Sequence, residues 1–165
     1  MSLNIKKFRF NILETLPLLF LFYLSFIGSS IINIGFLSIN VLYILVYFWV
    51  LRKPQILGYG YIFLSGIISD VVLGMPLGIN ALSLLFIAGT AAYIRVVTVR
   101  ITLINDWISF IPALIFANFI YFASMNLSNI EVDYIYFLKN SIFTFIFYPI
   151  LWIVFSLYLN LIKNN

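Results

Sequence analysis

The chain contains no cysteine and no histidine among its 165 residues. Without these residues it has no disulfides, thiolate nucleophiles or imidazole bases, and it lacks the usual zinc ligands. Acidic residues are also few, and no two lie close within one apolar segment: Glu14, Asp70, Asp106, Glu131 and Asp133. A two-carboxylate acid/base site is therefore hard to assemble. We expect a protein that is not an enzyme and that holds no metal or cofactor.

Charge of either sign is scarce, whereas apolar residues are abundant. Only 8% of the residues are charged, and 64% are hydrophobic. Soluble domains average about 25% charged and about 45–50% apolar residues. A soluble core of this size would not bury such an excess of apolar side chains, so the composition predicts an all-α integral membrane protein.

Long apolar segments give the expected number of membrane spans. A helix needs about 20 mostly apolar residues to cross a bilayer. The sequence offers six such segments, with the second one short: residues 12–32, 36–51, 55–74, 77–96, 107–126 and 138–161. Only short loops and tails remain, which predicts a single transmembrane domain over residues 1–165.

The basic residues predict the orientation of these spans. With the N-terminus in the cytoplasm, eight of the nine basic residues fall on the cytoplasmic side: Lys6, Lys7, Arg9, Arg52, Lys53, Arg95, Arg100 and Lys163. Enrichment of Lys and Arg in cytoplasmic loops is typical of membrane proteins. We therefore expect both termini to be cytoplasmic. These small, separated clusters form no contiguous basic face, so the net charge of +4 does not indicate a nucleic-acid partner.

The stretch SDVVLGMPLGINAL, residues 69–82, joins the third and fourth predicted helices. Gly74 and Gly78 permit a positive φ, and Pro76 stops one helix while suiting the start of the next. The pattern predicts a tight antiparallel helical hairpin. Asp70 and Asn80 are expected near its outer end.

Asp70 is the acid whose role the sequence leaves open. An acid within a membrane segment usually faces the protein interior and has a partner. It can be a structural group that accepts hydrogen bonds from Ser, Asn or the free amides at the start of the fourth helix. It can instead contact a ligand or a partner protein. A proton relay or catalytic acid is the third alternative, although no second titratable group lies nearby in the sequence.

Small residues form stripes on both helices of this hairpin. Such residues let neighbouring backbones approach closely. The stripes comprise Gly58, Ser65 and Ser69 with nearby Gly66 on the third helix, and Ala81, Ala88 and Ala92 on the fourth. Two further polar residues have simpler expected roles. Asp106 is expected to cap the fifth helix, and Asn118 to form a hydrogen bond across helices.

The run from Gly66 to Leu82 resembles the signature hairpin of the rod shape-determining protein MreD family. The family pattern is Gly, a few apolar residues, Asp, and then Gly-x-Pro-Leu-Gly before an apolar helix. This chain matches it at Gly66, Asp70, Gly74, Pro76, Leu77 and Gly78. The aromatic Phe48-Trp49 followed by Arg52-Lys53-Pro54 is also similar to the family. A departure is Ser38-Ile39, where many members carry a Pro.

The resemblance implies a non-enzymatic scaffold subunit of the bacterial elongation (rod) complex, in the cytoplasmic (inner) membrane. Its most direct partner would be MreC, with MreB, RodA and a class B penicillin-binding transpeptidase in the same complex. Together these proteins support lateral peptidoglycan synthesis and rod shape. The small-residue stripes would receive the single transmembrane helix of MreC. The expected structural or partner-docking residues are Gly66, Ser69, Asp70, Gly74, Pro76, Gly78 and Asn80.

An alternative function is the substrate-binding membrane subunit of an energy-coupling factor vitamin transporter. Those subunits also have about six helices, and the MreD family is similar to them in fold. A transporter needs polar groups around its substrate. The expected external loops offer few such groups beyond residues 126–133.

Overall fold

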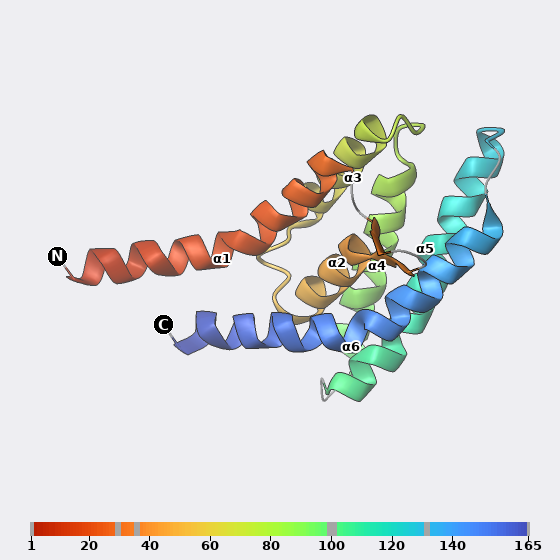
Figure 1. Ribbon diagram of the computed structural model, residues 1–165. Coiled ribbons are helices and arrows are strands. Elements are labelled where there is room, and N and C mark those ends of the chain that lie inside the picture. The colour runs from red at the N-terminus through yellow and green to blue at the C-terminus, as the bar shows by residue number, and fades with distance from the viewer. Residues whose placement is uncertain (1, 29–30, 35–36, 99–101, 131–132, 165) are drawn as a thin grey trace.

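The computed structural model describes residues 2–28, 31–34, 37–98, 102–130 and 133–164, which form six helices and one two-stranded sheet (Figure 1). The elements in chain order are α1 (Ser2–Ile27), β1 (Ile31–Ile34), β2 (Leu37–Asn40), α2 (Val41–Arg52), α3 (Tyr59–Val72), α4 (Ile79–Val97), α5 (Leu103–Leu127) and α6 (Tyr134–Asn164). The predominantly helical fold predicted from composition is confirmed.

Three of these helices are long and apolar enough to cross a membrane. They are α4, α5 and the Tyr134–Ile162 part of α6. Three shorter apolar helices accompany them, namely Leu13–Ile27 of α1, α2 and α3. These lengths and compositions are consistent with a membrane protein.

The segment between α1 and α2 differs from the prediction, because it is a β-hairpin. β1 and β2 pair antiparallel, with Ile31 opposite Asn40. α1 stops at Ile27 since Gly28 adopts a positive φ of 68°, a conformation that ends helices. α2 begins only after Asn40, whose side chain accepts a hydrogen bond from the backbone N–H of Tyr43 at 3.1 Å. The expected helix end at residue 32 and the expected start at 36 are therefore wrong.

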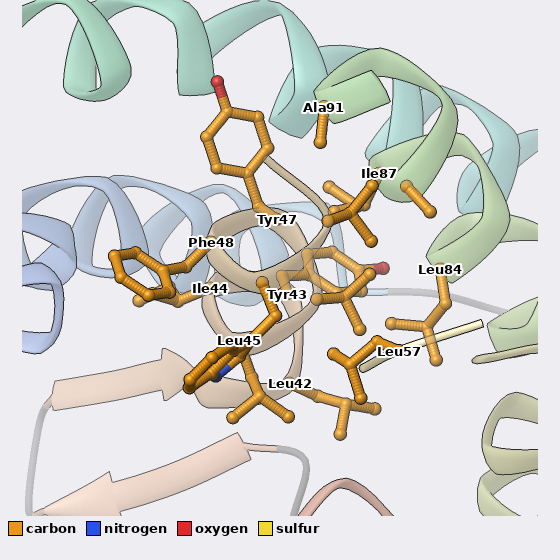
Figure 2. Packing of buried hydrophobic residues seen from close by; sticks show 14 of the residues in the cluster. Leu42, Tyr43, Ile44, Leu45, Tyr47, Phe48, Leu57, Leu84, Ile87 and Ala91 are labelled. Atoms are coloured by element: carbon orange, nitrogen blue, oxygen red, sulfur yellow. The ribbon is translucent and has the colours of Figure 1, made fainter. Parts of the chain in front are cut away.

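α2 lies at the centre of the molecule. Every residue from Val41 to Leu51 is buried. Figure 2 shows side chains leaving α2 in all directions: Phe48 lies on one side, and Tyr43 points to the other side, toward Leu84 of α4. A helix that is apolar all round is typical of such a buried position. The other helices therefore pack around α2 as a core element.

The remaining helices pack in neighbouring pairs around this centre. α4 packs most extensively against α5 and α3, while α6 runs along β2. Figure 1 shows that both ends of the chain lie on the same side of the molecule, where the first part of α1 extends away from the bundle. The turn between α3 and α4 lies at the amino terminus of α4, and Val97 marks the opposite end of that helix.

Candidate functional site

Asp70 is fully buried near the end of α3, and its carboxylate binds the start of α4. One oxygen, Oδ2, accepts a hydrogen bond from the backbone N–H of Gly78 at 2.8 Å, and Oδ1 accepts one from Asn80 at 2.9 Å. The first N–H groups of a helix have no partner within the helix. A negative charge is also favourable at a helix amino terminus. Asp70 therefore caps α4 from the preceding helix.

The backbone of Asp70 at the same time closes α3. Its carbonyl oxygen accepts a hydrogen bond from Met75 N–H at 2.9 Å, and the carbonyl of Val71 accepts one from Gly74 at 3.3 Å. These two bonds form a Schellman motif, which favours glycine at the position with positive φ. Gly74 has a φ of 65° there. One residue thus fixes both the end of α3 and the start of α4.

The turn between these helices, residues 70–80, is further tied to α5. Gly78 precedes α4 with a φ of 103° and has no side chain to cap it, so the Asp70 carboxylate takes that role. The Met75 thioether lies 3.6 Å from both the Asn80 side-chain nitrogen and the Tyr121 hydroxyl. Tyr121 belongs to α5, so three helices meet at this turn.

Gly66 brings the backbones of α3 and α4 into direct contact. A Cβ atom built on Gly66 would lie 2.3 Å from the Cα of Ala81 and 2.6 Å from its nitrogen. Real Cβ atoms do not approach backbone this closely, so α3 can pack here only because residue 66 is glycine. Ser69 is buried beside this contact, and its hydroxyl has no hydrogen-bond partner among the described residues.

The small-residue stripes are therefore occupied within the protein. The described side chains of Ser65, Ser69, Ala81 and Ala88 are all buried. The part of the stripes that these four residues form is packed within the chain and is not open to the helix of a partner, whereas Gly58 and Ala92 are half-buried. Binding of a partner by this protein stays a prediction. The predicted site residues do come together in one place: Gly66, Ser69, Asp70, Gly74, Pro76, Gly78 and Asn80 all lie at the α3–α4 turn or the crossing beneath it. The sequence leaves three roles open for Asp70. The hydrogen bonds expected for the structural role, from the free amides at the start of the fourth helix, are present.

A second buried acid, Asp106, joins three helices at the other end of α4. Its Oδ2 accepts hydrogen bonds from Arg52 Nη2 at 2.9 Å and from Trp152 Nε1 at 2.8 Å. Arg52 ends α2, Asp106 lies in the first turn of α5, and Trp152 belongs to α6. The guanidinium also lies 5.3 Å from the Trp152 ring centre. We call these three residues the Arg52 cluster.

The expected capping role of Asp106 is wrong. Thr102 caps α5 instead, because its hydroxyl accepts a hydrogen bond from Asn105 N–H at 3.3 Å. The Asp106 side chain is engaged with Arg52 and Trp152. The sequence partly indicates this pair, because Arg52 and Asp106 both flank apolar segments and lie on the same predicted side of the membrane. A separation of 54 residues, however, hides such a pair from local patterns.

Two further contacts hold α1 at this end of the molecule. Lys53 Nζ lies 3.2 Å from Glu14 Oε1. The Tyr158 hydroxyl of α6 donates a hydrogen bond of 2.6 Å to the carbonyl of Leu13. Pro17 lies four residues after Leu13 and has no N–H, so it leaves that carbonyl without its helical donor. Tyr158 therefore supplies the missing hydrogen bond from another helix.

No protein-family model, no curated protein and no solved structure matches this chain.

The predicted contact of Asn118 is present, and several of the charges used to predict the topology lie outside the described residues. Asn118 of α5 donates to the hydroxyl of Ser141 in α6 at 2.7 Å, which confirms its predicted cross-helix bond. In the ranges that the structure describes, no group of three His, Cys, Asp or Glu residues is placed to hold a metal ion. Several charges of the topology prediction lie outside the described residues: the side chains of Lys6, Lys7, Arg9 and Lys163, and all of Arg100 and Glu131.

Proposed function

We propose that this chain is a non-enzymatic, multi-pass scaffold subunit of the bacterial elongation complex, similar to MreD, in the cytoplasmic membrane. The observation that carries the proposal is the geometry of the α3–α4 turn. Residues that carry the sequence resemblance have specific structural roles there: Gly66 at the helix contact, Asp70 in both caps, and Gly74 and Gly78 at positive φ. The residues of the family pattern therefore shape one helical hairpin, which supports the proposal.

We further propose six spans with both termini in the cytoplasm. α2 is only about 18 Å long, whereas the hydrocarbon core is about 30 Å thick. The β1–β2 hairpin directly precedes α2, and we propose that it supplies part of the missing length. Both chain ends lie on one side in Figure 1, as an even number of crossings requires.

The MreC transmembrane helix then needs a docking face other than the buried stripes. We propose the exposed face of α4 around Gly89. A shallow apolar groove of about 410 Å³ lies there, lined by Leu82, Leu85, Phe86, Gly89, Thr90 and Tyr93. No atom lies within 4 Å of a Cβ built on Gly89. A glycine on a lipid-facing surface lets a second backbone approach closely.

Co-purification of MreC tests this face with a matched pair of variants. Gly89→Leu fills the groove and is expected to reduce the amount of MreC that co-purifies. Gly60→Leu is the control, because Gly60 lies on α3 and also has no atom within 4 Å of a built Cβ. Equal MreC recovery with both variants would place the docking face elsewhere. Substitution of Gly66 or Asp70 is less informative, because it disturbs the hairpin itself.

Depletion of the protein tests the function as a whole. Loss of rod shape and of lateral peptidoglycan synthesis is the expected result in a rod-shaped host. Unchanged shape together with loss of uptake of a vitamin would support the transporter alternative instead. The cell morphology and the uptake rate are measured in the same depletion strain.

A further inference from the structure

A cavity of about 410 Å³ lies between α1 and the segment that joins α2 to α3. One part of its wall is apolar, with Leu18, Ile56 and Tyr61, and another part is polar. The polar part contains Glu14, Lys53 and Gln55. The cavity is therefore amphipathic, which distinguishes it from the apolar grooves elsewhere on the described surface.

The cavity lies where apolar helices meet their polar ends. Glu14 is the second residue of the apolar segment Leu13–Ile27, and Lys53 directly follows the last residue of α2. In a membrane protein this is the depth of the lipid headgroups, where long charged side chains reach the interface. A molecule that enters the cavity from the bilayer thus has its charged part beside Glu14 and Lys53.

The two charges at the cavity are close together and open to a further partner. Lys53 Nζ and Glu14 Oε1 are 3.2 Å apart, and the side chains are 27% and 34% exposed. A partly exposed ion pair of this kind contributes little stability by itself. A ligand that offers an anion to Lys53 and a cation to Glu14 completes a network of four alternating charges. The neighbouring Arg52 does not compete for Glu14, because its guanidinium binds Asp106.

We propose that this cavity binds the headgroup of a zwitterionic phospholipid with a primary amine, that is, phosphatidylethanolamine. The phosphate pairs with Lys53, and the ammonium donates hydrogen bonds to the Glu14 carboxylate. The apolar wall at Leu18, Ile56 and Tyr61 covers the beginning of an acyl chain. This inference does not depend on the scaffold function, because it concerns the lipid that surrounds the protein in either case.

Three lipids with the same acyl chains separate the contributions of the headgroup. Phosphatidylcholine keeps the phosphate and the positive charge but has no N–H donor, and phosphatidylglycerol has no positive charge. The full chain is purified in detergent, and each lipid is titrated while binding is followed by native mass spectrometry and by the thermal midpoint. We expect the half-saturating concentration of phosphatidylethanolamine to be about threefold to tenfold below that of phosphatidylcholine, as for the net contribution of one additional hydrogen bond.

Two variants assign this preference to the cavity. Glu14→Gln is expected to remove the preference for phosphatidylethanolamine over phosphatidylcholine, and Lys53→Met to weaken binding of all three lipids. Lys139→Met is the matched control, because Lys139 is an exposed lysine near the start of α6 and is expected to leave binding unchanged. Equal binding of the first two lipids, tighter binding of phosphatidylglycerol, or a preference that survives Glu14→Gln would each overturn the proposal.

Discussion

At the scale of single residues, Asp70 shows how a fully buried acid is held by backbone groups. Its side chain is fully buried, and both carboxylate oxygens and the backbone oxygen accept hydrogen bonds from N–H groups. A buried charge is tolerated only when its hydrogen bonds are complete. Asp70 has no titratable neighbour in the sequence. Backbone N–H groups, rather than a positive side chain, therefore stabilise its carboxylate.

Asp70→Asn is expected to destabilise the protein by about 1–3 kcal/mol. The amide keeps one acceptor oxygen, but its NH₂ group would face a backbone N–H that also donates. The thermal midpoint in detergent measures the change. Glu14→Gln provides the comparison, because that carboxylate is half-exposed and its ion pair contributes little. Equal stability of the two variants would show that the Asp70 carboxylate does not cap α4.

The Arg52 cluster shows a different solution for a buried acid. Asp106 is 2% exposed and binds one charged donor and one indole donor, each from a different helix. Removal of one partner from such a pair leaves an uncompensated charge, which is strongly destabilising. Asp106 therefore ties α2, α5 and α6 together at the end of the molecule opposite to Asp70.

At the scale of helices, the crossing of α3 and α4 depends on the absence of one methyl group. Gly66→Ala is expected to destabilise the protein by about 1–3 kcal/mol, because the new Cβ would collide with the backbone of Ala81 and the helices would have to separate. Gly60→Ala on the same helix meets no atom within 4 Å. It is expected to be neutral or to stabilise α3 by up to about 1 kcal/mol, since alanine favours helices.

Opposite signs for these two Gly→Ala substitutions are therefore the expected result. The unfolding of both variants in SDS or by heat, relative to the unsubstituted protein, provides the measurement. A loss of stability of similar size at both positions would contradict a close contact between α3 and α4 at Gly66.

The contact between α1 and α6 gives a second prediction at this scale. Tyr158→Phe is expected to cost about 1 kcal/mol, because the carbonyl of Leu13 loses its donor. In a Pro17→Ala background the residue at position 17 supplies a helical N–H, so the same Tyr158→Phe change is expected to cost less. A double-mutant cycle on unfolding free energies measures this coupling.

Tyr93→Phe serves as the control for the loss of a hydroxyl, because Tyr93 of α4 is 70% exposed and its substitution is expected to be neutral. Strictly additive effects of Pro17→Ala and Tyr158→Phe would contradict the assigned role of Tyr158.

The sequence allowed the helices to be predicted more easily than the segment between α1 and α2. Long apolar runs predict α4, α5 and α6 to within a few residues. The stretch that ends in Leu37-Ser38-Ile39-Asn40 alternates between apolar and polar residues, a strand signal that its position among apolar helices obscured. The Asp70 turn was predictable because its partners lie within ten residues, whereas the Arg52–Asp106 pair spans 54.

At the scale of the whole molecule, the orientation in the membrane is the property that the proposals share. The absence of cysteine makes it directly measurable, because single-cysteine variants carry no background label. Lys139→Cys in intact cells is expected to react with an impermeant maleimide. Arg95→Cys is expected to react only after the cells are opened, because the last turn of α4 lies on the predicted cytoplasmic side. Both positions are exposed in the structure.

The reverse labelling pattern, or labelling of both positions from outside, would contradict the six-span topology with cytoplasmic termini.

The cap on α4 also has a consequence for how the protein is made. Asp70 is synthesised before its donors, which follow eight residues later at Gly78 and ten residues later at Asn80. A lone α3 would enter the bilayer with an unpaired acid, at a cost of up to about 3 kcal/mol. With its 14 residues, α3 is also too short to cross the bilayer well on its own. We therefore expect α3 to insert only together with the start of α4.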